Sequence, residues 1–258
     1  YGRSGNSPES VAAVTLADQV VKNCQHLILT CNPEGELAKK SQSQDNVFSI
    51  IMPEGTLDQS FAMTSSFTSM LVSTLAIFSP DPQQLESAAQ WAEQLLSSGI
   101  EQLKAQAQKP TKRLVFLGSG GLQGIAREAA LKCLELTAGQ ILSYFESPLG
   151  FRHGPKSLMD GSTEVIVLTS SNHYTKLYDC DLIAELERDN QALDITVLNA
   201  ESFAQTHALD DVWAGLPYIV YCQILAFYKS IDANITPDNP CPTGEVNRVV
   251  QGVTLYLL

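Results

Sequence analysis

A histidine and a glutamate eighteen residues apart are the side chains of this sequence that could carry acid–base chemistry. His153 lies in Phe151-Arg152-His153-Gly154-Pro155, between a cation and a Gly-Pro turn, and is one of four histidines in 258 residues. Glu135 lies on a predicted helix that follows the glycine turn Gly118–Gly121. An imidazole can open a sugar ring near neutral pH, and a carboxylate with a raised pKa can move a proton between two carbons. The competing interpretation is a loop histidine that caps a helix or bonds a carbonyl.

Lys132 lies three residues before Glu135 and therefore on the same face of that helix. If the two side chains face a cavity with His153, they form a set of cation, carboxylate base and general acid. If they lie on the surface, the pair contributes little.

Two further segments could bind a substrate. Ser4-Gly5-Asn6-Ser7 precedes a helix, and hydroxyls with free amides at a helix N-terminus bind anions. Ser7 is also a plausible N-cap before Pro8, so ordinary capping is the alternative. Thr64 and Ser65 begin another predicted helical segment and could contact a polyol, or could bond the local backbone.

The turn that begins with Gly118-Ser119-Gly120-Gly121 follows a strand and precedes a helix, as a dinucleotide-binding loop does. Gln123 stands where the dinucleotide motif requires glycine, and Glu146 lies later than the usual acidic partner. A tight turn between strand and helix is an equal alternative.

Composition excludes several classes of function. The net charge of −12 argues against nucleic acid and anionic membrane as partners, and it leaves an anionic small molecule possible. No apolar run is long enough to span a bilayer. The six cysteines show no zinc-ligand spacing, so we expect reduced thiols, no metal, no cofactor and a cytoplasmic location.

Short apolar strands alternate with helices along the chain, which predicts an α/β fold with parallel sheets covered on both faces. Lys109-Pro110-Thr111-Lys112 is a charged break, so we expect two units, 1–108 and 109–258. The start at Tyr1 reads as the end of a strand, from which we expect a first unit that is incomplete at its N-terminus. Strands are expected at 26–30, 47–52, 113–117, 141–145, 164–169 and 195–198, and helices at 8–23, 34–40, 59–78, from 82 to about 103, 122–137, 174–189 and 217–231.

Taken together, these motifs resemble the sugar isomerase (SIS) family. The resemblance rests on Ser4 to Glu9, the Gly118–Gly121 turn, Ala130 to Glu135 and Arg152 to Pro155. Phe61 to Phe67 and Asn239 to Pro242 look closer to the galactosamine-6-phosphate deaminases of the family, also labelled tagatose-6-phosphate ketose/aldose isomerases.

The resemblance implies two flavodoxin-like SIS units of the three-layer α/β/α type, in a homodimer or higher oligomer whose site is shared between subunits. It implies sugar-phosphate contacts from the segments Ser4–Ser7 and Thr64–Ser65 and from Ser119. It further implies that Glu135 moves a proton between C1 and C2, that Lys132 assists it and that His153 opens the ring.

The reaction that the resemblance implies is deaminating isomerisation of a hexosamine 6-phosphate. The related glucosamine-6-phosphate synthase has a C-terminal lysine that forms a Schiff base, and Gln251 aligns there. The synthase's glutamine-hydrolysing domain also has no counterpart in this sequence, which favours ammonia release over ammonia donation. A non-deaminating isomerase, a non-catalytic sugar-phosphate sensor and a nicotinamide oxidoreductase remain as alternatives.

Overall fold

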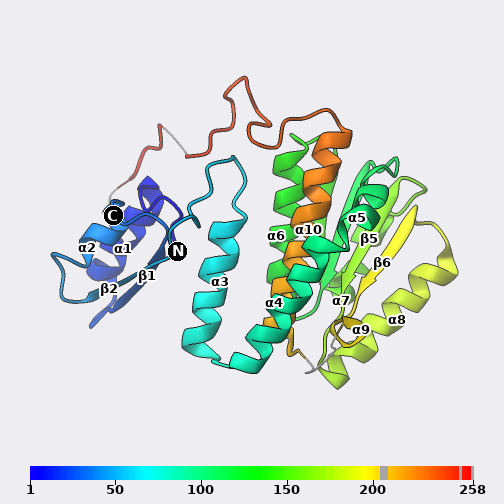
Figure 1. Cartoon of the computed structure of the whole chain (residues 1–258), viewed down its shortest axis with the longest axis horizontal. Coiled ribbons are helices and arrows are strands. Elements are labelled where there is room, and N and C mark those ends of the chain that lie inside the picture. The colour runs from blue at the N-terminus through cyan, green and yellow to red at the C-terminus, as the bar shows by residue number, and fades with distance from the viewer. Residues whose placement is uncertain (204–208, 250–251, 257–258) are drawn as a thin grey trace. The chain divides into compact units, whose positions relative to one another are not determined.

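The computed structural model describes residues 1–203, 209–249 and 252–256. The chain divides into two compact units, one made of Tyr1–Ser79 with Cys241–Leu258 and the other of Pro80–Pro240. Each unit contains parallel strands joined through helices (Figure 1). This arrangement confirms the predicted α/β class.

The first unit has a parallel pair of strands, β1 (His26–Thr30) and β2 (Val47–Ile51). Gly2 runs alongside β1 and forms a parallel bridge with Thr30. Helices α1 (Pro8–Val20), α2 (Glu36–Lys40) and α3 (Ser65–Phe78) complete the unit.

Two small cores cover the two faces of this pair of strands. Ile28 packs with Leu37 of α2 and with partly buried valines of α1. Leu29, the next residue along β1, packs with Met70 of α3. Because neighbouring side chains of a strand point to opposite faces, the first unit has three layers, with α1 and α2 on one side and α3 on the other.

The second unit holds a four-stranded parallel sheet in the order β4-β3-β5-β6. Its strands are β3 (Arg113–Gly118), β4 (Leu142–Glu146), β5 (Thr163–Leu168) and β6 (Asp194–Leu198). Its helices are α4 (Pro82–Ser97), α5 (Ile100–Ala107), α6 (Leu122–Leu136), α7 (Pro148–Phe151), α8 (His173–Asp189), α9 (Ala200–Phe203) and α10 (Asp211–Asp232), with a 3-10 turn η1 at Pro155–Leu158.

Helices cover both faces of this sheet (Figure 1). On one face, Val115 and Val167 pack with Phe151 of α7 and with Leu182 and Leu186 of α8. On the other, α4, α5 and α6 pack around α10. Every residue of β5 is buried as a result, which is the pattern of a strand enclosed on both sides.

Most predicted elements are present, and the largest differences in extent concern three helical segments. Helix α3 begins at Ser65 rather than at residue 59, and the helix expected after Pro82 is two helices that meet at Gly99. Helix α10 begins at Asp211, so Pro217 lies inside it rather than at its start. Packing groups α4 and α5 with the second unit. The predicted domain boundary after residue 108 stays a prediction.

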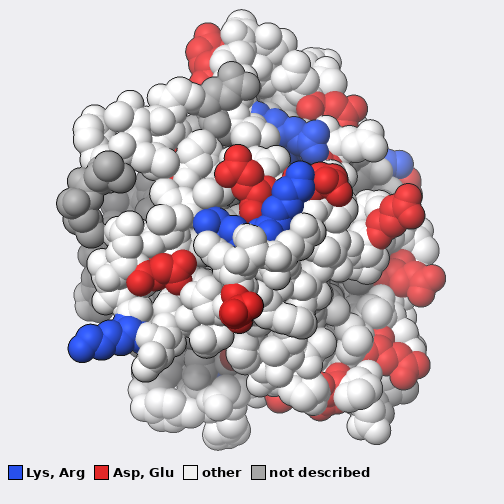
Figure 2. Space-filling view, turned by 90° about the vertical axis from the view of Figure 1, so that its left-hand side faces the viewer, with Lys and Arg blue, Asp and Glu red and all other residues white. Residues whose placement is uncertain are grey.

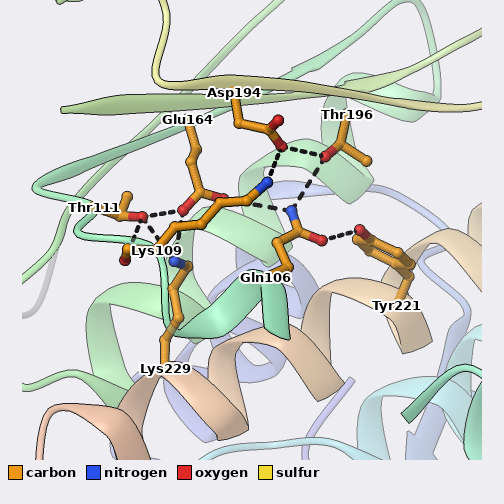
Figure 3. A network of polar contacts seen from close by, with 8 residues as sticks. All are labelled: Gln106, Lys109, Thr111, Glu164, Asp194, Thr196, Tyr221 and Lys229. Carbon is orange, nitrogen blue, oxygen red and sulfur yellow. Dashed lines mark hydrogen bonds and ion pairs between the residues drawn. The ribbon is translucent and has the colours of Figure 1, made fainter. Parts of the chain in front are cut away.

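A buried ion pair lies near the amino ends of β3 and β5 (Figure 3). Lys229 Nζ of α10 lies 2.7 Å from Glu164 Oε1, and each side chain is 1% exposed. Thr111 bonds both of them, and Gln106 of α5 links Glu164 to Tyr221 and Thr196. This network joins two helices, α5 and α10, to strands β5 and β6 at the side of the sheet opposite to the carboxyl ends of the strands.

Charged side chains of both signs lie close together on the face drawn in Figure 2, where basic side chains gather near the middle with acidic ones directly beside them. That face offers no wide basic field to a nucleic acid. Within residues 1–203, 209–249 and 252–256, no helix has both the length and the apolar character of a membrane span.

Candidate functional site

Helix α6 carries the predicted carboxylate base next to a buried cation. Lys132 Nζ lies 2.5 Å from Glu135 Oε2, and the lysine side chain is only 2% exposed, whereas Glu135 is 25% exposed. The helix follows the glycine turn, and its buried positions recur on one face, so Lys132 is turned inward with the apolar residues. A buried ammonium that holds a half-buried carboxylate is not an ordinary surface pair.

Glu128 is a third member of this group that the sequence reasoning missed. Its Oε1 lies 3.4 Å from Lys132 Nζ, one turn before the lysine. Burial raises the pKa of Glu128, although Lys132 opposes that shift. The spacing of Glu128, Lys132 and Glu135 along one helix face is the signal that could have identified it.

His153 lies on the short connection between α7 and η1. Phe151, two residues before it, is fully buried among strand and helix side chains. Gly154, directly after it, has a φ of 132°, which favours glycine. The backbone N–H of His153 donates to Gly150 O at 3.0 Å, and the residue is exposed. Within the described residues, Glu135 pairs with Lys132 and not with His153.

Serines and aspartates meet where β3 and β5 end, at the point where the strand order reverses. Ser119 Oγ donates to Asp179 Oδ1 at 2.6 Å, and Asp179 also accepts the N–H of Ser170. Ser170 Oγ donates to Asp211. Burial raises the pKa of Asp179, and the charge of Asp211 adds to that effect. The two carboxylates would repel the pyrophosphate of a dinucleotide. A tight turn between strand and helix therefore describes Gly118–Gly121 better than a dinucleotide-binding loop does.

The loop Ser4–Ser7 of the first unit is held by several hydrogen bonds. Ser4 Oγ accepts the N–H of Asn6 at 3.2 Å, and Asn32 Nδ2 donates to Ser4 O at 2.9 Å. Asn6 Oδ1 accepts the N–H of Glu36 at 2.9 Å, so this side chain supports the start of α2. Gly5 has a φ of 67°, and a Cβ there would lie 3.4 Å from Gly35 Cα.

Ser7 occupies the N-cap position of α1, as predicted, but its hydroxyl forms no capping hydrogen bond. Pro8 is the first residue of the helix. The neighbouring Arg3 is 8% exposed and donates to the backbone oxygens of Phe61 and Arg248. The first amides of α1 therefore receive no hydrogen bond from the side chain at the N-cap position. The buried Arg3 beside the loop was not predicted as a site residue from the sequence.

The N-terminus of α3 is occupied by a carboxylate of the chain itself. Asp58 accepts the backbone N–H groups of Thr64, Ser65 and Ser66 and the hydroxyls of Thr64 and Ser66. Burial raises the pKa of Asp58, but the hydrogen bonds from Ser66 and Thr64 outweigh it and the net shift is downward. The Thr64 hydroxyl donates its hydrogen to Asp58, so toward a sugar it would act as an acceptor. Ser65 is exposed.

The first unit contains a cluster of side chains that are able to bind a metal ion. Asp18, Cys24 and His26 lie close enough together to hold a metal ion, although their sequence spacing predicted none. His26 Nε2 and Asp18 Oδ1 are hydrogen-bonded at 2.7 Å, so these two groups are satisfied by each other.

Gln251, the residue aligned with the Schiff-base lysine, lies outside the described residues.

Known proteins resemble this chain along almost its whole length. It is 56% identical over 256 residues to the D-galactosamine-6-phosphate deaminase AgaS of Shewanella sp. strain ANA-3, covering 99% of this chain and 66% of that protein. It is 48% identical over 271 residues to the protein of the same name from Escherichia coli O157:H7, covering 99% of this chain and 71% of the relative. The chain thus spans about two thirds of the length of these relatives.

A solved structure agrees with the sequence relatives. The crystal structure of tagatose-6-phosphate ketose/aldose isomerase from Escherichia coli superposes with a TM-score of 0.88 at 45% identity, covering 93% of this chain and 69% of that one. No protein-family model matches the chain. On these identities and this fold, the chain belongs to the D-galactosamine-6-phosphate deaminase family of sugar isomerase (SIS) enzymes.

Proposed function

We propose that the protein converts galactosamine 6-phosphate and water into tagatose 6-phosphate and ammonia. The substrate is a 2-amino aldose, so isomerisation moves the carbonyl from C1 to C2, where the nitrogen is attached. The C2 imine that results takes up water and loses ammonia. The names of the relatives, one a deaminase and one a ketose/aldose isomerase, describe these two halves of the reaction and support the proposal.

Three side chains divide the acid–base work in this proposal. His153 donates a proton to the ring oxygen and opens the sugar. Glu135 removes the proton from C2 of the open aldose and returns it to C1, which leaves the imine at C2. Lys132 holds Glu135 in place through their ion pair.

The phosphate is assigned to the segment Ser4–Ser7. The unfilled amides at the start of α1 and the Ser7 hydroxyl, which forms no capping bond, support this assignment. Thr64, Ser65 and Ser119 remain proposed contacts to the sugar hydroxyls. Thr64 and Ser119 each bond an aspartate, so they would offer oxygen acceptors to the sugar.

The exposure of His153 supports a homodimer or higher oligomer in which the histidine serves a neighbouring subunit. We further propose a cytoplasmic hydrolase that needs no metal or cofactor. Water is the second reactant, and proton transfer between adjacent carbons requires only acid and base groups.

The observation that carries the proposal is the buried Lys132 that holds Glu135 on α6. A non-catalytic sensor would need the phosphate loop alone and has no use for a buried cation beside a half-exposed carboxylate. The same pair would serve a non-deaminating isomerase, so the nature of the products must decide between the two enzymes.

The deciding experiment supplies galactosamine 6-phosphate to the purified protein at its natural length, without nicotinamide. We expect ammonia and tagatose 6-phosphate in equal amounts. Reversible aldose–ketose conversion of a sugar phosphate without ammonia would instead identify a plain isomerase. Binding without turnover would identify a sensor.

A further inference from the structure

The loop that carries His153 is tied to one face of α8 by two cations. Arg152 precedes His153, and Lys156 follows it by three residues. Their partners Asp181, Glu185 and Asp189 are spaced four residues apart on α8 and so lie along one face of that helix, here termed the acidic stripe.

Glu185 is shared by both cations. Its Oε2 lies 3.0 Å from Arg152 Nε, an ion-pair distance without hydrogen-bond geometry, and its Oε1 bonds Lys156. Each cation also pairs with a second carboxylate of the acidic stripe. Arg152 Nη2 lies 2.8 Å from Asp181 Oδ2, and Lys156 pairs with Asp189. The hydrogen bonds that Lys156 donates to Asp189 and Glu185 raise the pKa of Lys156, and the bond to Asp189 lowers the pKa of that carboxylate.

The backbone on either side of His153 is restrained as well. Phe151 is buried against Leu182 and Leu186, which belong to the same helix as the acidic stripe. Gly154 has its φ of 132°, and Pro155 begins η1. The two ion pairs to Glu185 lie on opposite sides of Gly154 in the sequence, one at Arg152 and one at Lys156.

Stability alone does not account for this arrangement. Partly exposed ion pairs contribute little to the free energy of unfolding. A shared carboxylate with one cation before and one cation after an exposed histidine instead restrains the stretch of backbone that carries the imidazole. A displacement of about 1 Å at a catalytic group can lower a rate about 100-fold, so a small restraint on direction can have a large kinetic effect.

We infer that Glu185 is a positioning residue that fixes the direction of the His153 imidazole through Arg152 and Lys156. The inference rests on the proposed ring-opening role of His153. Glu185 need not touch the substrate. Its effect should therefore appear in the step that His153 performs and not in the proton transfer performed by Glu135.

The test compares Glu185→Gln with wild type and with Glu187→Gln, an exposed glutamate on the same helix, in the protein at its natural length. For Glu185→Gln we expect kcat on cyclic galactosamine 6-phosphate to fall about tenfold or more, with KM changed less than about twofold and an unchanged melting temperature. Proton exchange at C1 or C2 of an acyclic substrate analogue should stay at the wild-type rate. Glu187→Gln should behave as wild type in both assays.

Added salt gives a second readout, because it screens partly exposed charges. Wild-type kcat should fall as salt rises, and kcat of Glu185→Gln should respond less. Wild-type kcat in Glu185→Gln, or equal loss in the cyclic and acyclic assays, would overturn the inference. Absence of turnover in the wild type would refute the proposed function instead, so the two failures are distinguishable.

Discussion

Lys132 governs the charge around the proposed proton-transfer base. It is nearly inaccessible to water and lies within ion-pair distance of both Glu128 and Glu135. Burial raises the pKa of Glu128, and the neighbouring charge of Glu135 adds to that effect. Glu135 is the more exposed of the two and is the one left to meet a substrate.

Replacement of Glu135 tests this assignment at the level of a single atom. Glu135→Gln keeps the shape of the side chain and removes the base, so kcat should fall about 100-fold or more, while affinity for galactosamine 6-phosphate is largely retained. Steady-state kinetics and calorimetry of the variant measure the two quantities. Turnover close to wild type would contradict the role of Glu135.

The segment Ser4–Ser7, to which we assign the phosphate, gives a prediction about affinity rather than about kcat. Ser4→Ala combined with Ser7→Ala removes two hydroxyls and leaves the backbone of α1 intact, so binding of 6-phosphorylated sugars should weaken by about tenfold. Calorimetry with tagatose 6-phosphate measures the loss, and unphosphorylated galactosamine serves as the control ligand. Unchanged affinity would mean that the two serines only shape the helix start.

Helix α3 shows how a single residue can set the start of an element. Asp58 accepts hydrogen bonds from the backbone of Thr64 to Ser66. It therefore caps the helix although it lies in the segment before the N-cap residue, Thr64. Asp58→Ala removes those bonds, and we expect the free energy of unfolding to fall by about 2 kcal/mol. Chemical denaturation measures it, with exposed Asp45→Ala as the matched control.

The pH dependence of the same contact has a definite sign. The pKa of folded Asp58 lies below its ordinary value of 3.8, so its contribution is complete above the unfolded pKa and is lost as pH falls through the folded one. The stability difference between wild type and Asp58→Asn should therefore be largest near about pH 6 and shrink below about pH 3. A difference that grows in acid would show that the carboxylate is not the stabilising form.

The elements were predictable from the sequence where local pattern decides them. Strand β1 and the start of α1 appear at the expected residues because apolar runs and the Ser7-Pro8 pair mark them. The start of α3 was misplaced because Asp58, several residues upstream, forms the cap. The roles of the site residues named from the sequence stay predictions, and the spacing of Glu128 from Lys132 was visible there too. The burial of Lys132, and the pairing of the acidic stripe with Arg152 and Lys156, depend on packing that a linear sequence does not display.

At the scale of the whole molecule, the buried Lys229–Glu164 pair ties the last helix of the second unit to the sheet (Figure 3). Lys229→Met should lower the free energy of unfolding by about 3–5 kcal/mol, because it leaves Glu164 buried without its cation. The double variant Lys229→Met with Glu164→Leu should be less destabilised than the single one. Thermal and chemical denaturation of Lys229→Met, Glu164→Leu and the double variant measures this coupling, and additive losses would show that the two charges act independently.

The close packing of the loop Ser4–Ser7 has a consequence for the thermodynamics of phosphate binding. Gly35 lies so near that a Cβ on it would be 2.5 Å from Ser4 O. Within the loop, Asn6 Oδ1 accepts the N–H of Glu36 at the start of α2, and Asn32, after β1, donates to Ser4 O. The loop is therefore preorganised before any ligand arrives, and little conformational entropy is left to lose on binding. A phosphate should meet amides that already point in the required direction, so calorimetry should show only a small unfavourable entropy when tagatose 6-phosphate binds.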